Sequence, residues 1–229
     1  MTENLAANPV DHFPPAVRLT PALKSLILSL QKRMDSAVYQ EMMSSVCLLF
    51  KQTQKQLLAT EPGTARAHIL HQLIDTAIES VSHIPVSCQK ACSACCHFEV
   101  QITQDEADLL AELVMQGHPV DIAQLEKQSR RQVQDLAWQE GVVPTNRCAF
   151  LNPENACGIY VARPAACRRH SVVSPAQLCS DLKATPTSRN IPIAEVILSA
   201  AMSLPEVEIG SLSRMLALKL NANEKARSA

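Results

Sequence analysis

Eight of the nine cysteines in this 229-residue chain fall into two groups of four, and thiols gathered in this way need a chemical reason. Three reasons are available: disulfide bonds, ligation of a metal or an iron–sulfur cluster, and thiol catalysis. The odd total fits a disulfide framework poorly. The first group is Cys88, Cys92, Cys95 and Cys96, and the second is Cys148, Cys157, Cys167 and Cys179.

The cellular compartment of the protein helps to choose between disulfide bonds and metal ligation. The first twenty residues are polar, contain three prolines and lack the apolar stretch of a signal peptide. The longest apolar runs, such as residues 46–50, are too short to cross a bilayer. We therefore expect a cytoplasmic protein with no membrane span. Because cytoplasmic thiols stay reduced, this expectation favours metal ligands over structural disulfides.

Composition indicates a largely helical protein. Aromatic residues make up only 3% of the chain, there are five glycines, and runs typical of strands are few. The formal net charge of −1 gives no overall attraction to nucleic acid or to anionic membranes. The second cysteine group also lacks the interleaved aromatics of a stacking platform for nucleic acid. We expect a protein or small-molecule partner of unknown identity and no nucleic acid.

Helix signals precede the first cysteine group. Thr20 and Pro21 are a typical N-cap and first helical residue. The apolar spacing after them predicts one helix that continues to about Leu58. A second helix is predicted over residues 64–82. Cys47 lies in the first of these helices, where we expect a small buried side chain.

Further elements follow the first cysteines. Residues 98–102 alternate between apolar and polar side chains, which predicts a short strand. Residues 103–106 form a capping box that begins a helix ending near Gly117. The next helix is predicted from about Val120 to Glu140. Shorter or later helices are predicted after Pro164, over 176–183, around 193–202 and over 205–221.

Together these elements predict one mainly α-helical unit, in which helices pack around a turn-rich, cysteine-ligated metal module with at most a short strand or two. We divide the chain into an N-terminal helical segment (1–85), a cysteine-rich module (86–183) and a C-terminal helical segment (184–229). The module carries a helical insert, 103–141, between its two cysteine groups. A chain of this length buries enough surface to fold without disulfides.

The spacing of Cys88, Cys92 and Cys95 is that by which radical enzymes dependent on S-adenosylmethionine hold a [4Fe–4S] cluster. Those enzymes continue into alternating strands and helices, and no such alternation follows here. The adjacent pair Cys95 and Cys96 is more informative. In an extended segment the two side chains point to opposite sides, whereas in a tight turn both approach one centre. Eight cysteines equal two four-ligand sites, so one centre and two centres are both open.

A longer ordered pattern runs through both cysteine groups. It consists of Cys88, Cys92, Cys95, Cys96, Cys148, Phe150, Leu151, Cys157, Ile159, Tyr160, Arg163, Pro164, Cys167 and Arg168. This pattern resembles the bacterial CxxCxxCC family, the YkgJ-like zinc- or iron-chelating proteins, whose relatives include a flagellin lysine N-methylase. The resemblance covers about residues 88–170, with Cys179 as its last member. Two departures are Ala149, where the family has proline, and an insert of about 50 residues between the groups.

The resemblance implies metal binding. We take all eight cysteines of the two groups as candidate ligands of zinc or iron, with an iron–sulfur cluster as an alternative cofactor. His97 or His170 could replace a cysteine as a ligand, because imidazole suits both metals, but we expect each of them to be a hydrogen-bond donor beside the site or an exposed residue. Cys167 is expected in the first turn of a helix, where the dipole favours a thiolate.

Charged residues near the cysteines have simpler interpretations than catalysis. We expect the cationic residues of 142–190 to offset thiolate charge, in preference to forming an anion-docking surface. They are Arg147, Arg163, Arg168, Arg169, Lys183 and Arg189. The acidic residues at the start of the helix after the capping box, Asp105, Glu106 and Asp108, complement its dipole. His68 and His71 are expected at the surface or at the edge of the core.

Three functions fit these observations. The first, which we favour, is a metal-binding protein whose site shapes a fold or an interaction surface. The second is a metalloenzyme that modifies a protein, such as a lysine N-methyltransferase, although no loop typical of S-adenosylmethionine binding is visible in the sequence. The third is a metal or redox sensor, or a metal carrier, in which Cys95 and Cys96 exchange ligands.

Overall fold

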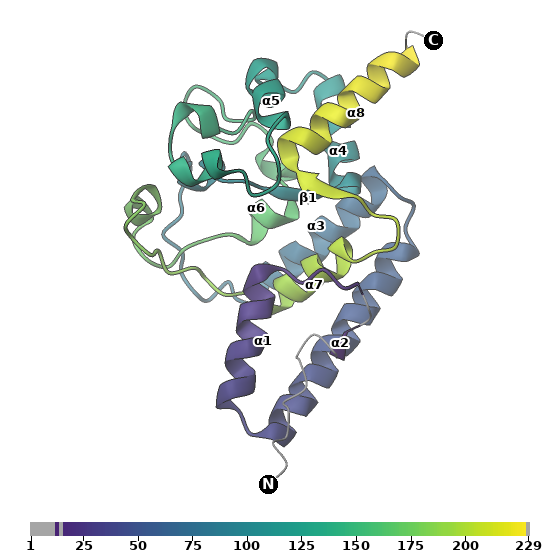
Figure 1. The fold of residues 1–229 in the computed structure, drawn as a ribbon, viewed down its shortest axis with the longest axis vertical. Helices are drawn as coiled ribbons and strands as arrows, with labels where there is room; N and C mark the ends of the chain where they lie inside the picture. Colours follow the sequence, from purple (N-terminus) through teal and green to yellow (C-terminus); the bar gives the residue numbers. More distant parts are fainter. Residues whose placement is uncertain (1–11, 14–15, 228–229) are drawn as a thin grey trace.

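The chain is mainly helical, as predicted (Figure 1). The computed structural model describes residues 12–13 and 16–227, and within them it has eight α-helices and one two-stranded sheet. The helices are α1 (Pro21–Arg33), α2 (Ser36–Leu58), α3 (Thr64–Glu79), α4 (Gln104–Met115), α5 (Ile122–Ser129), α6 (Ala165–Arg169), α7 (Pro192–Met202) and α8 (Leu212–Arg227). The strands are β1 (Gln101–Thr103) and β2 (Ile209–Ser211). Turn-rich segments carry the 3-10 helices η2 (Ala94–His97), η3 (Leu136–Glu140), η4 (Pro144–Asn146), η5 (Tyr160–Ala162) and η6 (Ala176–Ser180).

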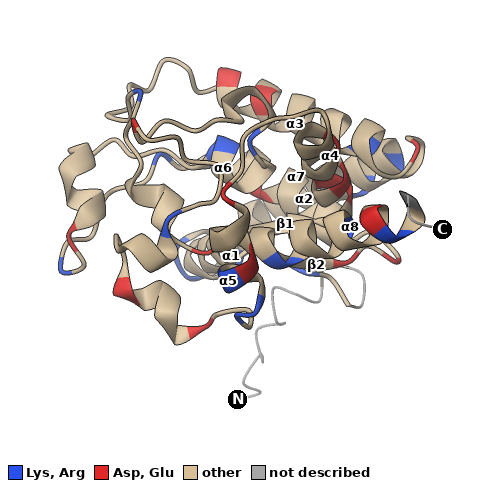
Figure 2. Cartoon of the chain, turned by 90° about the horizontal axis from the view of Figure 1, so that it is seen from above, with Lys and Arg blue, Asp and Glu red and all other residues tan. Residues whose placement is uncertain are grey.

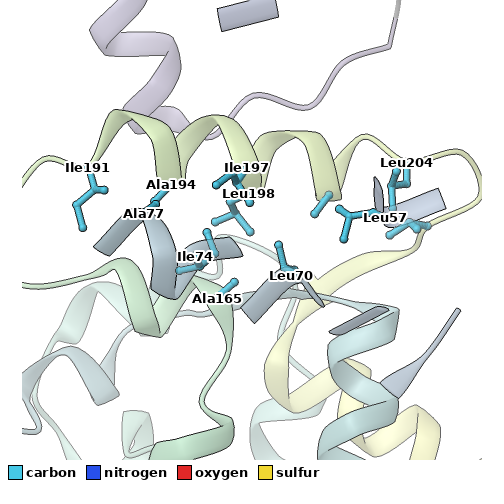
Figure 3. Close-up of a cluster of buried hydrophobic side chains, with 12 residues drawn as sticks. Leu57, Leu70, Ile74, Ala77, Ala165, Ile191, Ala194, Ile197, Leu198 and Leu204 are labelled. Carbon is cyan, nitrogen blue, oxygen red and sulfur yellow. The ribbon is translucent and has the colours of Figure 1, made fainter. Parts of the chain in front are cut away.

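Helix α7 is the centre of one half of the fold. All residues from 194 to 201 are buried, so this helix must be covered around its whole circumference. On one side Ile197 contacts the cluster that includes Ile74 of α3 (Figure 3). On the other side Val196 belongs to the cluster that contains Phe50 of α2. Helix α7 therefore joins α2 and α3, although it lies far from them in the sequence.

The other half of the fold forms around α4, α5 and α8. Strands β1 and β2 pair in antiparallel fashion with Ile102 opposite Gly210, so α4 and α8 start at opposite ends of this small sheet. The two helices then pack against each other. The buried cluster here includes Ile102, Leu110 of α4 and Leu216 of α8. Cys148 and Cys157 pack against the same cluster, so part of the second cysteine group rests directly on this core.

The prediction of one helix from Pro21 to Leu58 was wrong, because the chain breaks near Asp35. Met34 has extended backbone angles, and the Asp35 carboxylate accepts the Ala37 N–H over 2.9 Å as the N-cap of α2. Apolar spacing continues across the break, and a capping side chain overrides it. The result is a helical hairpin of α1 and α2 that projects from the rest of the molecule (Figure 1).

The prediction of one helix from Val120 to Glu140 was also wrong. Helix α5 ends at Ser129, and Gln134 has a positive φ of 62° with its N–H donated to the Glu99 carboxylate over 2.9 Å. Leu136, an apolar residue within the predicted helix, is 74% exposed. A tertiary hydrogen bond and a second N-cap at Asp135 explain why periodicity failed here.

Several other predictions are confirmed. Helix α3 begins at Thr64 as expected, and the capping box at Thr103 opens α4, which closes before Gly117 with a φ of +94°. A helix of five residues contains Cys167. The helix predicted over 205–221 begins later, at Leu212, because the preceding residues form β2.

No helix of the described residues is long and apolar enough to cross a membrane. The division of the chain at residues 85 and 183 stays a prediction. Contacts nevertheless link the three segments, since α7 packs against α2 and α3 while α8 packs against α4 and α5.

The central position of α7 predicts a large difference between two of its isoleucines. Ile197 is 4% exposed and Ile193 is 46% exposed. Ile197→Ala should lower the free energy of unfolding by about 2–4 kcal/mol, because it leaves a cavity in the core. Ile193→Ala, the matched control, should lower it by less than about 1 kcal/mol. Urea denaturation of both variants measures this, and equal losses would contradict the assigned orientation of α7.

Candidate metal centre

The cysteine-bearing segments lie together as loops and short 3-10 helices on one side of the helical body (Figure 1). Helix η2, which contains Cys95 and Cys96, packs against η6, which contains Cys179. The N–H of Cys148 donates to the carbonyl of Cys96 over 2.9 Å. The fold therefore joins the end of the first cysteine group to the start of the second.

Five of the thiols influence one another; four belong to half-buried residues and the fifth, Cys95, to an exposed one. Burial raises the pKa of Cys148 to about 11, and the thiolates of Cys157 and Cys95 add to the rise. Burial also raises the pKa of Cys167, with further contributions from the same three neighbours. The thiolates of Cys95, Cys148 and Cys167 contribute to a raised pKa of Cys96. Because charge interactions of this kind weaken with distance, we take these five thiols as one group and call it the buried thiol set.

Cys95 and Cys96 differ in acidity. A hydrogen bond from the Cys96 thiol and, to a smaller extent, the Arg163 guanidinium lower the pKa of Cys95 to about 7, against the opposing effect of burial. The same hydrogen bond, together with burial, raises the pKa of Cys96. Cys95 is exposed as a residue, whereas Cys96 is half-buried. Cys95 is thus the thiol of the pair that ionises first.

The remaining three cysteines lie nearer the surface. Cys88 is exposed, and Cys92 and Cys179 are half-buried. Burial raises the pKa of Cys179, and the thiolates of Cys92, Cys88 and Cys95 raise it further. We call Cys88, Cys92 and Cys179 the surface thiol set. Cys95, a member of the buried thiol set, connects the two sets, because its thiolate raises the pKa of Cys157 in one set and of Cys179 in the other.

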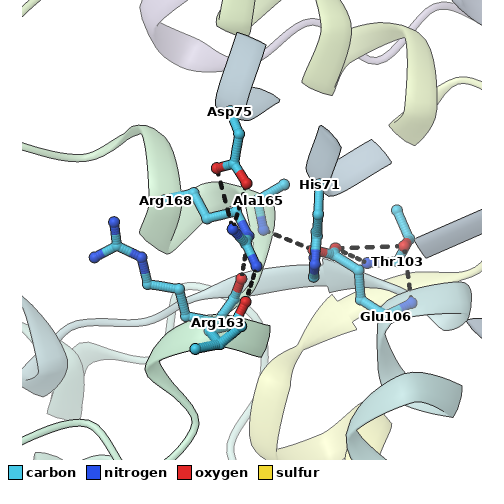
Figure 4. Close-up of polar contacts among 8 residues, drawn as sticks. His71, Asp75, Thr103, Glu106, Arg163, Ala165 and Arg168 are labelled. Atoms are coloured by element: carbon cyan, nitrogen blue, oxygen red, sulfur yellow. Dashed lines mark hydrogen bonds and ion pairs between the residues drawn. The ribbon is translucent and has the colours of Figure 1, made fainter. Parts of the chain in front are cut away.

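A buried carboxylate positions the short helix that carries Cys167 (Figure 4). Glu106, 1% exposed, accepts the N–H of Ala165, the first residue of α6, over 2.7 Å. Its Oε1 also lies 3.1 Å from Nε2 of His71 on α3. Its Oε2 accepts the N–H of Thr103 over 3.1 Å and closes the capping box of α4. One side chain therefore links α3, α4 and α6.

Two consecutive arginines fix the other end of α6. Arg168 pairs with Asp75 of α3 over 2.8 Å, and its Nε donates to the carbonyl of Arg163 over 2.8 Å (Figure 4). Arg169 forms an ion pair with Glu195 of α7. Glu195 in turn accepts the hydroxyl of Thr20 over 2.6 Å, at the start of α1. Helix α6 is therefore tied to α1, α3, α4 and α7.

The arginines closest to the thiols also support loops. Arg147 donates to Asn155 over 2.6 Å and to the carbonyl of Leu151 over 3.2 Å, across the turn before Cys157. The Arg163 guanidinium lies 4.3 Å from the ring centroid of Tyr160. In the ribbon of Figure 2, positions of Lys and Arg are interspersed with positions of Asp and Glu. These contacts favour the interpretation of the arginines as supports of the site over a docking surface.

The two histidines next to the cysteines differ in their surroundings. His97 is buried and its Nδ1 lies 3.0 Å from the carbonyl of Ser93. His170 is exposed as a residue, and partial desolvation of its ring, together with the nearby Arg169, lowers its pKa. Neither observation tests whether His97 or His170 binds a metal, so their role as ligands stays a prediction. Cys47, expected to be buried, is half-buried, and its thiol donates to the carbonyl of His12 over 3.2 Å.

Sequence reasoning missed the residues that hold α6. His71 was expected at the surface or core edge and is buried, and Glu106 was expected only to complement the dipole of α4. The capping box was a sequence signal for one of the contacts of Glu106. The contacts with His71 and Ala165 join residues far apart in the chain and have no local signal. The dipole expected to favour a Cys167 thiolate is outweighed by burial.

The thiol groups fit a zinc or iron site by their chemistry. Thiolates select these metals, and the nearby Arg163 and Arg147 lower the electrostatic cost of gathering them. In the part of the chain that the structure describes, no three Cys, His, Asp or Glu side chains already stand as a ligand group around one point. The thiols are neighbours whose side chains would have to turn toward a common ion.

The network around Glu106 predicts a large loss of stability on a small change. Glu106→Gln should lower the free energy of unfolding by about 2–4 kcal/mol, because an amide presents a donor where the carboxylate accepts. Glu126→Gln, at an exposed position on α5, is the matched control and should change stability by less than about 0.5 kcal/mol. Chemical denaturation measures both, and a neutral Glu106→Gln would contradict the role given to this carboxylate.

The acidity of Cys95 predicts selective alkylation of the metal-free protein. The rate for Cys95 should rise with pH to half its maximum near pH 7, since its pKa is lowered to about 7 and the thiolate is the nucleophile. Cys47, whose pKa is raised by burial, should react only at more alkaline pH. Iodoacetamide labelling with peptide mass spectrometry measures both rates. The same pH dependence at the two thiols would show that the hydrogen bond from Cys96 has no effect.

Comparison with known proteins agrees with the geometry. Residues 87–188 match the model of the CxxCxxCC family, described as a "Putative zinc- or iron-chelating domain". No curated protein and no solved structure gives a significant match to the chain. The matched range includes all eight cysteines of the buried and surface thiol sets. Over residues 87–188 the chain is therefore similar to the CxxCxxCC family.

Proposed function

We propose that the protein binds zinc or iron through thiolates of its two cysteine groups. The observation that carries this proposal is the gathering of eight thiols from separate segments, with Cys95 between the two sets. The description of the matching family as zinc- or iron-chelating supports it. In this role the helices form a frame, and the turn-rich segments supply the ligands.

Electrostatics supports a cation at this place. All nine cysteines are free thiols, and members of the buried thiol set repel one another once ionised. A divalent ion removes this repulsion, because a metal binds thiolates and releases their protons. Four thiolates around a divalent ion leave a charge of about −2. Arg163 lies near Cys95 and Cys157 and would offset part of that charge.

The supports of α6 favour a fixed ligand over a mobile one. Cys167 lies between Ala165, held by Glu106, and the arginines held by Asp75 and Glu195. Metal ligands that are already oriented bind with a smaller loss of conformational entropy. The contacts of α6 would therefore serve the metal centre as much as the fold.

The proposal predicts the effect of three serine substitutions. Cys92→Ser and Cys157→Ser should each lower the metal content of the purified protein, because each removes a proposed ligand. Cys47→Ser, which changes a thiol outside both sets, should leave the metal content unchanged. Anaerobic purification followed by inductively coupled plasma mass spectrometry measures zinc and iron per chain. Equal metal content in all three variants and the wild type would contradict the proposed ligands.

A further inference from the structure

The carboxylate of Glu195, in the first turn of α7, has partners in two other parts of the fold. The side chain is buried. Its Oε2 accepts the hydroxyl of Thr20 over 2.6 Å, and its Oε1 accepts a hydrogen bond from Nη1 of Arg169. Because a buried charge is stable only while hydrogen bonds satisfy it, the loss of one partner weakens the position of the carboxylate for the other. Thr20 and Arg169 are therefore coupled through Glu195, although they lie far apart in the sequence.

Thr20 attaches helix α1 to α7. Its Oγ1 accepts the N–H of Leu23 over 3.2 Å and so caps α1. Its own N–H donates to the hydroxyl of Ser199 on α7 over 3.0 Å. Of the residues of α1, all of which the structure describes, only Leu23 and Ile27 are buried. With so little buried apolar surface, the helix depends on the contacts of its first turn with α7.

Arg169 attaches the same carboxylate to the helix of a candidate ligand. It is the last residue of α6, two positions after Cys167, and α6 has only five residues. A helix of this length gains little from its own hydrogen bonds, so it is ordered by what its side chains bind. A metal ion held by Cys167 would add one such anchor at the centre of α6 and keep Arg169 in place on Glu195. Thr20, Glu195 and Arg169 form one connected series, which we call the polar relay.

We propose that the polar relay couples metal binding at Cys167 to the docking of α1 on α7. The inference rests on the proposed function and extends it to helices that lie outside residues 87–188, the range that matches the family. Metal binding strengthens the contact of Thr20 with Glu195, so α1 opens less often. Because coupling between two sites is reciprocal, docking of α1 raises the affinity for the metal by the same factor. Thr20 and Glu195 are thus positioning residues that act on Cys167 through Arg169.

Hydrogen exchange of α1 measures the coupling in the reduced, full-length wild type. The metal-free chain is loaded under nitrogen with zinc or, in a parallel sample, with ferrous iron, and peptides of α1 are followed by mass spectrometry. Helix α1 should exchange about fivefold or more slowly with bound metal, the lower end of typical coupling between two sites. Peptides of α7, whose residues 194–201 are buried, should exchange more slowly than α1, which shows that α1 opens locally.

Two substitutions of Thr20 separate the polar relay from simple capping. Thr20→Val removes the hydroxyl, so the metal dependence of α1 exchange should disappear, and metal affinity, measured by competition with a chelator, should weaken by the factor that is lost. Thr20→Ser keeps the hydroxyl and should retain both effects. The matched control Asp35→Ala removes the N-cap of α2, whose carboxylate binds the Ala37 N–H, and should leave the metal dependence of α1 unchanged.

The outcomes separate the coupling from the proposed function. Metal binding in the wild type with unchanged exchange of α1, or an α1 that exchanges only together with α7, would overturn the coupling and leave the proposed function intact. If Thr20 only capped α1, Thr20→Val would speed exchange equally with and without metal, which would also overturn the coupling. A wild type that takes up neither zinc nor iron would overturn both. The wild-type comparison needs no variant, so it decides the matter even if Thr20→Val does not fold.

Discussion

The buried carboxylate of Glu106 is the constraint on which the arrangement of the site depends. A charge removed from water is tolerated only when hydrogen bonds satisfy it, and here Thr103, His71 and Ala165 do so from three different elements. These contacts fix the positions of the three partners relative to one another. Helix α6 is too short to be stable alone. Its position is therefore fixed by its contacts with α3 and α4.

The helices form the buried cores, and the loops carry most of the candidate ligands. The helices bury two aliphatic cores, around α7 and around α4 and α8, and neither core contains a ligand set of its own. Apart from Cys47 in α2 and Cys167 in the short helix α6, the cysteines lie in turns, loops and 3-10 helices. Arg168 and Arg169 connect the two layers through Asp75 and Glu195. Most of the candidate ligands thus lie on loops that the helices position.

Many of the helix starts and the cysteine pattern could be predicted from the sequence. The features that could not be predicted are mostly contacts between residues far apart in the chain. The N-cap at Thr20, the capping box at Thr103 and the cysteine pattern are local signals, and all three led to correct predictions. The helix break at Asp35 was also local and was missed, because apolar spacing was given more weight than the cap. The pairing of β1 with β2 and the contacts of Glu106 join distant residues. No single segment contains the information for such contacts.

The most direct test of the account is the metal content and visible spectrum of the wild-type protein, purified without oxygen and without added metal. The account predicts zinc or iron in at least stoichiometric amount, with thiols protected from alkylation until a chelator is added. A colourless protein with stoichiometric zinc and a coloured protein with iron both agree with thiolate ligation. A protein that contains neither metal, does not take up either one, and has eight freely reactive thiols in the matched domain would contradict it.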